Sequence, residues 1–408
     1  MTGFSRQGAA LVCDGVPLDS IASTHGTPLY VYSAAAIAGR YRAIDAAFAG
    51  CPHAIHYALK ANSTLAITRL LRRLGSHADA NSGGEIDVAM RAGFLPSQIV
   101  FTGVGKTAAE LGQAIDLGVR SINVESAGEI QRIHALSGAR NVRTRIAIRV
   151  NPDVDAKTHP HISTGLKINK FGIPISDVAE VCAMARGRAS IEIVGLHAHV
   201  GSQITNMEPL ARAARSLVDL ARTLAAQGTA IEHLDIGGGL GVSYDGSPVP
   251  GVTDYAAAVL PILKESGLAI VLEPGRHIMA PAGVLLTTVV DVKGPFVVVD
   301  AGMTELIRPM MYNAFHRIEP VRQTDAPAST FHIVGPLCES SDTLGKDRTI
   351  PVPEVGDLFA VMDAGAYGSV MASNYNRRLF PAEVMVEDGA ARVIRRRQTL
   401  EDVLALES

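Results

Sequence analysis

The sequence has few of the features that mark secreted, metal-binding or membrane proteins. It contains only four cysteines, Cys13, Cys51, Cys182 and Cys338, and none lies in a CxxC pair or near a histidine at metal-ligand spacing. This pattern predicts reduced thiols, with no metal site and no disulfide framework. No apolar run reaches about 18 residues, and residues 1–10 lack the regions of a signal or transit peptide. We therefore expect a cytoplasmic protein without a membrane partner.

Charge of one sign is also scarce. The net charge is -3, and the one short basic run, at residues 395–397, lies near the C-terminus. This balance argues against nucleic acid as a partner and favours a small, charged substrate. A chain of 408 residues that is 47% hydrophobic is long enough for a large core and for two domains.

Short β-rich runs alternate with Ala- and Leu-rich helical stretches through the first two thirds of the chain, which is typical of repeated βα units around a parallel sheet. About eight such units occur, and eight units close into a (β/α)₈ barrel of the α/β class. The expected strands are residues 54–59, 77–80, 99–102, 121–125, 145–150, 193–200, 233–236 and 269–273.

The pattern changes after about Pro281, where β-branched runs are separated by glycine and proline turns. Residues 383–387 and 391–395 flank Asp388-Gly389 and predict a β-hairpin. We expect a (β/α)₈ barrel over residues 28–280, and a second, mostly antiparallel β domain from residues 1–27 and 281–408.

Polar residues stand where the predicted barrel strands end. Active sites of such barrels form at the C-terminal ends of the strands. The residues at these ends are Lys60, Asp79, Glu125, Arg149, His199 with Ser202, Gly237 to Gly239, and Glu273 with Arg276.

Lys60 closes an apolar strand, so its ammonium would stand at the barrel mouth, partly desolvated. Desolvation lowers an amine's pKa and raises its nucleophilicity, as Schiff-base chemistry requires. Taken alone, Lys60 also fits an ordinary surface lysine at a strand end.

The glycine run from Gly237 to Gly241 could bring backbone N–H groups close to a phosphate, although a bare turn fits as well. His199 could stack on a planar cofactor, whereas His197 is better interpreted as a core histidine. Glu273 could hold a pyridine nitrogen protonated, or it could form a structural pair with Arg276.

Together, the following segments resemble the diaminopimelate decarboxylases, which share an alanine-racemase-like fold with ornithine and arginine decarboxylases. The resemblance covers nearly the whole chain. The segments are Tyr57 to Asn62, Asp79 to Glu85, His161 to Gly172, His199 to Gln203, the Gly237 run, Glu273 to Arg276, Arg308 to Tyr312, Cys338 to Asp342 and Gly365 to Gly368.

The resemblance implies pyridoxal 5'-phosphate (PLP) as cofactor and a role for each matched residue. Lys60 would be the Schiff-base lysine and Cys338 the proton donor. The other cofactor-binding residues would be Asp79, Arg149, His199, Ser202, Gly238, Gly239, Glu273, Gly275, Arg276 and Tyr367. The substrate-binding residues would be Arg276, Arg308, Tyr312, Glu339 and Tyr367.

The resemblance also implies a homodimer, in which Cys338 and Glu339 reach the active site of the partner subunit. The expected substrate is meso-diaminopimelate, which carries a second carboxylate that ornithine lacks. Arg276 and Arg308 offer guanidinium groups for that carboxylate, and Tyr312, four residues after Arg308, would lie on the same face if that segment is helical.

Two alternatives stay open from the sequence. One is a decarboxylase of another basic amino acid, of the ornithine or arginine type. The other is a non-catalytic regulator that binds PLP. The presence of Lys60, Cys338 and Glu339 argues against the second alternative.

Overall fold

The computed structural model describes residues 3–155, 165 and 169–407, and it divides into two compact units. The barrel unit comprises Tyr41–Gly241 and Val249–His277. The β unit comprises Met1–Arg40, Val242–Pro248 and Ile278–Ser408. Within the described residues, no helix is both long enough and apolar enough to cross a membrane.

The barrel unit contains a closed ring of parallel strands, as the sequence predicts. Each strand pairs with the next in the order of the chain, and pairing of β13 with β5 and of β8 with β9 completes the ring. A short strand, β10 (Ile173–Pro174), pairs with β9 outside the ring. The ring strands are β5 (His53–Ala58), β6 (His77–Ala80), β7 (Ile99–Phe101), β8 (Ser121–Val124), β9 (Thr144–Asn151), β11 (Ile191–His197), β12 (His233–Asp235) and β13 (Ala269–Leu272).

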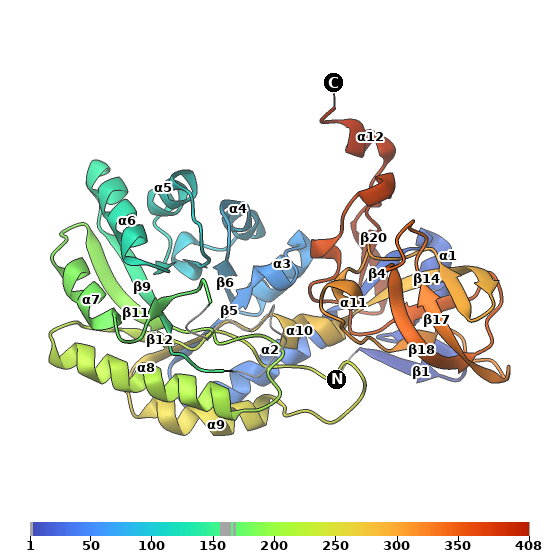
Figure 1. Ribbon diagram of the computed structural model, residues 1–408, viewed down its shortest axis with the longest axis horizontal. Helices are drawn as coiled ribbons and strands as arrows, with labels where there is room; N and C mark the ends of the chain where they lie inside the picture. Colours follow the sequence, from blue (N-terminus) through green and yellow to red (C-terminus); the bar gives the residue numbers. More distant parts are fainter. Residues whose placement is uncertain (1–2, 156–164, 166–168, 408) are drawn as a thin grey trace. The chain divides into compact units, whose positions relative to one another are not determined.

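Helices alternate with these strands, and Figure 1 shows α5 to α9 arranged around their outside. Local sequence sets their ends: Thr107 and Glu110 form a capping box at the start of α5, and Gly118 ends it in the left-handed conformation. The helices are α2 (Ala34–Phe48), α3 (Leu65–Arg73), α4 (Gly83–Ala92), α5 (Ala108–Leu117), α6 (Ala127–Ala139), α7 (Val178–Arg186), α8 (Glu208–Ala226) and α9 (Val252–Lys264).

The β unit is built on a mostly antiparallel sheet with the order β18-β17-β15-β14-β4-β20-β21. Only the β15–β17 and β4–β20 pairs of this sheet are parallel. The strands are β4 (Leu29–Ser33), β14 (Gly283–Lys293), β15 (Phe296–Val299), β16 (Ile318–Pro320), β17 (Ala328–Val334), β18 (Thr343–Pro351), β19 (Leu358–Val361), β20 (Ala382–Glu387) and β21 (Ala390–Arg395). The unit's remaining elements are β1 (Phe4–Gln7), β2 (Ala10–Cys13), β3 (Val16–Pro17), α1 (Leu18–His25), α11 (Arg308–Met311) and α12 (Leu400–Leu404), with α10 (Arg276–Met279) at the border of the two units.

The predicted hairpin is present as β20 and β21. Asp388 and Gly389 both have positive φ, 52° and 76°, which is the backbone that a tight two-residue hairpin turn requires.

The observed division differs from the expected one at three segments, residues 28–40, 242–248 and 278–280, all of which belong to the β unit. β4 pairs with β14 and β20, and it therefore belongs to the β unit rather than to a barrel that begins at residue 28. All five residues of β4 are buried, so periodicity along the chain does not reveal which sheet it joins.

Candidate active site

Lys60 and Asp79 meet at the ends of two neighbouring barrel strands. Lys60 lies in the turn after β5, and its Nζ donates to Asp79 Oδ2 at 3.1 Å and to Asn81 Oδ1 at 3.3 Å. The Asp79 side chain is fully buried, whereas a third of the Lys60 side chain is exposed. The amine is therefore held in a fixed position and still accessible to a ligand.

Carboxyl groups around Lys60 have raised pKa values. Burial, followed by the charge of Glu273, raises the pKa of Asp79, although the Lys60 ammonium opposes this shift. Burial also raises the pKa of Glu85 to about 7, against a hydrogen bond from the Asn81 backbone N–H. Burial thus opposes ionisation of Asp79 and Glu85, whereas the Lys60 ammonium favours the ionised form of both.

Glu273 follows β13 directly and is buried in the barrel. Its Oε2 lies 3.2 Å from Nε2 of His197, at the end of β11. Its other oxygen, Oε1, is buried and has no hydrogen-bond partner among the described residues. A buried carboxylate oxygen without a partner is costly, and it indicates a ligand that donates a hydrogen bond.

The pKa of Glu273 is lowered even though burial acts to raise it. The charge and hydrogen bond of His197, together with the charge of Lys60, outweigh burial. Glu273 is therefore ionised over the physiological pH range.

His199 and the glycine run stand side by side. The Gly238 N–H donates to His199 Nδ1 at 3.2 Å. Gly237 and Gly239 have positive φ, and a Cβ on Gly238 would lie 2.2 Å from the Glu273 carbonyl oxygen. Glycine is thus required by backbone packing here. The N–H groups of Gly237 and Gly241 donate to Asp235 Oδ1 and to the Ile204 carbonyl, so they are already satisfied within the barrel.

Arg276 and Ser202 also come together. Nε and Nη2 of Arg276 both donate to Ser202 Oγ, at 3.1 and 3.0 Å. Gly275 fits closely against the turn that carries Lys60, since a Cβ there would lie 2.9 Å from that of Ala61. The structure thus brings the last strand end next to the first.

Arg149 pairs with Glu125 across the ends of β9 and β8. Nη1 lies 2.5 Å from Glu125 Oε1, and the guanidinium lies over the Phe171 ring at 4.8 Å. Glu125 also accepts from the Gly172 N–H at 2.8 Å. Most of the quoted segment from His161 to Gly172 lies outside the described residues.

Arg308 begins α11 in the β unit and is buried. Its Nη1 donates to His316 Nε2 at 2.6 Å, and its guanidinium lies over the Tyr244 ring at 4.4 Å. Helix α11 ends at Met311, and Tyr312 lies just beyond that end. The Tyr312 N–H still donates to the Arg308 carbonyl, which closes one helical turn between them.

Cys338 and Glu339 lie on an exposed loop between β17 and β18. Asp342 is buried and anchors this loop by accepting from the Met303 and Leu337 N–H groups at 2.7 and 2.9 Å. Glu339 Oε1 accepts from the Tyr375 hydroxyl at 2.8 Å. The thiol and the carboxylate are therefore presented to solvent by a loop with a fixed base.

Tyr367 has φ of 55°, a left-handed conformation that non-glycine residues rarely adopt. Such strain is concentrated at ligand sites in proteins.

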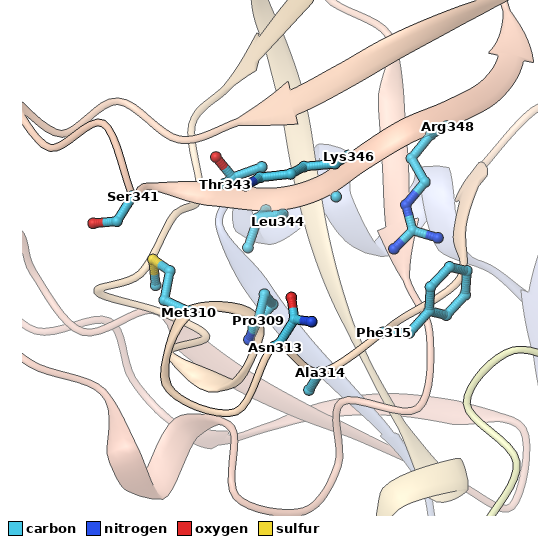
Figure 2. A pocket seen from close by; sticks show the side chains of 11 residues that line it. Pro309, Met310, Asn313, Ala314, Phe315, Ser341, Thr343, Leu344, Lys346 and Arg348 are labelled. Atoms are coloured by element: carbon cyan, nitrogen blue, oxygen red, sulfur yellow. The ribbon is translucent and has the colours of Figure 1, made fainter.

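A cavity of about 370 Å³ lies between β18 and the segment that follows Arg308. Figure 2 shows Met310 and Ser341 at one side of it and Arg348 over the Phe315 ring at the other. None of the predicted site residues lines this cavity, although it adjoins both the Arg308 and the Cys338 segments.

Some residues of the site were not selected from the sequence. Asn81 contacts Lys60, and Glu125 stood at a predicted strand end without being assigned a role. His197 was interpreted as a core histidine, and it is buried, but it also contacts Glu273. Its position two residues before His199, on a strand that ends at the barrel mouth, was the available signal.

The barrel and the strand-end residues define a class: barrel enzymes that hold a phosphorylated planar cofactor beside a reactive lysine. The family model "Pyridoxal-dependent decarboxylase, pyridoxal binding domain" matches residues 34–280. The diaminopimelate decarboxylase of Pseudomonas aeruginosa is 46% identical over all of this chain and 99% of its own length. That of Vibrio cholerae is 45% identical over 99% of this chain and 98% of its own.

Solved structures agree with these relatives. The diaminopimelate decarboxylase of Helicobacter pylori complexed with L-lysine is 44% identical, with a TM-score of 0.93 over 96% of this chain and 99% of that one. The enzyme of M. jannaschii in co-complex with L-lysine is 36% identical, with a TM-score of 0.95 over 100% and 98%. The chain belongs to the diaminopimelate decarboxylase family of PLP-dependent decarboxylases.

Proposed function

We propose that the protein decarboxylates meso-2,6-diaminopimelate to L-lysine and CO2, the last step of lysine biosynthesis, with PLP as cofactor. The observation that carries this proposal is that Lys60, held by Asp79, stands at the same end of the barrel as a buried, ionised Glu273 whose Oε1 has no hydrogen-bond partner among the described residues. Full-length relatives named for this activity support it.

The barrel residues fit PLP chemically. The orphaned Oε1 of Glu273 suits a protonated ring nitrogen, and the glycine run suits the phosphate. Bound PLP supplies an electron sink for the carbanion that loss of CO2 generates.

The roles that we propose for the barrel residues are those that the family resemblance implies, and their positions at the strand ends support them. Lys60 Nζ binds the cofactor covalently, and Asp79 orients that amine. Glu273 keeps the ring nitrogen protonated, and His199 stacks on the ring. Phosphate contacts come from Ser202, Gly238, Gly239, Gly275 and Arg276, and Arg149 lies close to the cofactor.

The β unit supplies the substrate-side groups in this proposal. Arg308 binds the distal carboxylate together with Arg276, because a guanidinium offers two parallel N–H donors to a carboxylate. Tyr312 and Tyr367 contact the substrate, and Glu339 binds its distal amine. Cys338 donates the proton that replaces the lost carboxylate.

A homodimer with shared active sites completes the proposal. The thiol of Cys338 and the carboxylate of Glu339 are exposed on an anchored loop, which suits groups that act in another subunit. The cytoplasmic location expected from the sequence stays a prediction.

The test is release of lysine and CO2 by the purified protein from meso-diaminopimelate, with and without added PLP. We expect turnover that depends on PLP and is at least about 100-fold lower with ornithine, because ornithine lacks the distal carboxylate that the site binds in this proposal. A cofactor-loaded enzyme that turns over ornithine but not diaminopimelate would establish the basic amino-acid alternative. Cofactor binding without release of CO2 from either compound would establish the other alternative, a non-catalytic regulator that binds PLP.

A further inference from the structure

Three neighbouring barrel strands each deliver one titratable side chain to the same buried point. His197 ends β11, Asp235 ends β12, and Glu273 follows β13. The parallel register pairs His197 with Asp235 and Asp235 with Val271, two residues before Glu273. One ligand-type atom from each of the three residues lies within 4.8 Å of the others, and all three side chains are buried.

The strand ends fix this group rigidly. Asp235 Oδ1 accepts from the Gly237 N–H at 2.8 Å, and the Glu273 N–H donates to the Gly237 carbonyl at 2.7 Å. His197 Nε2 lies 3.2 Å from Glu273 Oε2. The other carboxylate oxygen of Glu273, Oε1, is buried and has no hydrogen-bond partner among the described residues.

Two carboxyl groups this close in a dry interior do not both ionise, so one of them holds a proton. Burial raises the pKa of Asp235 well above its usual value, and the charge of Glu273 and a hydrogen bond to Glu273 raise it further. Burial also acts to raise the pKa of Glu273, but His197 and Lys60 lower it overall. The proton therefore resides on Asp235, and the negative charge on Glu273.

The other titratable groups near this trio agree with that distribution. The Asp79 carboxylate adds to the rise in the pKa of Asp235. His56, on β5, is fully buried, and burial keeps its pKa well below the usual value, so it brings no charge.

We propose that His197 and protonated Asp235 are positioning residues that keep Glu273 ionised and aim its Oε1 at the ring nitrogen of the cofactor. This inference rests on the proposed binding of PLP in the barrel, and it assigns a function to two residues outside the set selected from the sequence. Neither residue touches the cofactor or the substrate.

Conservative variants separate this role from simple packing. Asp235→Asn keeps an acceptor for the Gly237 N–H and gains a donor toward Glu273, so it imitates the protonated acid and should behave as wild type. Asp235→Ala loses both groups. His197→Gln keeps a donor near the Nε2 position, whereas His197→Leu and the smaller, polar His197→Asn do not. His233→Gln, at the opposite end of β12, is the matched control for a buried histidine.

The main measurement is the ¹⁵N chemical shift of ¹⁵N-labelled PLP bound to each holoenzyme, which reports protonation of the ring nitrogen. We expect a protonated nitrogen at neutral pH in wild type, Asp235→Asn, His197→Gln and His233→Gln. We expect its loss, together with a kcat that is about 10- to 100-fold lower at unchanged KM, in Asp235→Ala, His197→Leu and His197→Asn.

Two outcomes would overturn the inference. One is a protonated nitrogen and wild-type kcat in both His197→Leu and His197→Asn. The other is a loss in Asp235→Asn equal to that in Asp235→Ala, which would mean that Asp235 acts as an ion. If diaminopimelate is not the substrate, wild type shows no turnover but the ¹⁵N shifts still test the positioning role. If PLP does not bind at all, the proposed function itself fails.

Discussion

The barrel unit and the β unit present their proposed functional groups in opposite ways. In the barrel, Asp79 and Glu273 are buried and already paired with Lys60 and His197. In the β unit, Cys338 and Glu339 are exposed on a loop whose base is held by the buried Asp342. The proposed cofactor-binding groups are thus already in place within the barrel unit, whereas the proposed proton donor, Cys338, is exposed to solvent.

The difference shows that the buried barrel groups and the exposed loop groups have different energetic requirements for folding. Buried charges are stable only when paired, so the barrel groups must be fixed when the chain folds. An exposed thiol needs no partner to fold. It acquires a dry environment only when something else covers it, which agrees with the role in a partner subunit that the family resemblance implies for Cys338.

The largest expected effect tests the barrel side of this comparison. Lys60→Ala should lower kcat on the order of 10⁴-fold or more, because no other amine is placed beside Asp79 among the described residues. Steady-state lysine release measures this loss, and spectra of the bound cofactor show whether PLP is still retained. Activity close to that of wild type would end the assignment of Lys60.

Cys338→Ala tests the exposed side and should lower kcat about 10²- to 10⁴-fold, the usual range for loss of a general acid. Mixing it with Lys60→Ala subunits should restore up to about a quarter of wild-type activity, since half of randomly formed dimers would be mixed and each would have one intact site. Mixed dimers that form without any recovery would place Cys338 and Lys60 of one chain in the same site.

Arg308→Met should raise KM, or lower kcat/KM, for diaminopimelate about 10- to 100-fold, the scale of a lost charge-assisted hydrogen bond. Arg348→Met is the matched control, because it removes a half-buried guanidinium that also lies over an aromatic ring. Equal losses in both variants would show that Arg308 acts through packing in the β unit rather than through the substrate.

The smallest expected effect concerns pH and the buried Glu85. Its pKa in the folded protein is about 7, above the value of about 4.5 for an exposed glutamate, so the folded state binds its proton more tightly. Stability from this group is full below about pH 4.5 and is lost as the pH rises toward 7.

Glu85→Gln should therefore stabilise the protein at pH 8, by on the order of 1 to 3 kcal/mol, and hardly change it at pH 5. Thermal unfolding of the apoproteins at both pH values measures this difference. A variant that is less stable at pH 8 would show that the ionised form is the favoured one in the fold.

Much of the fold follows from local sequence. Each barrel strand was predicted to within a few residues, and β6 with its bounds unchanged, because buried parallel strands are short apolar runs between helical segments. The hairpin of β20 and β21 follows from Asp388-Gly389. The unit to which β4 belongs cannot be predicted from local sequence, because a fully buried strand fits the barrel and the second sheet equally well.

The candidate site divides in the same way. The sequence by itself determined that Lys60, Asp79, His199 and Glu273 reach one end of the barrel, because the C-terminal ends of parallel strands meet at one edge. The sequence also supplies the glycine run, and a side chain at Gly238 would clash with the Glu273 backbone.

Only the tertiary structure decided which of these groups pair and which carry charge. The residues Asp235 and Glu273 are both acids in the sequence, yet their surroundings move their pKa values in opposite directions. Those surroundings come from strands far apart in the chain, through burial and through the position of His197. Residue identity sets the available chemistry, whereas distance and burial select the protonation state in which it acts.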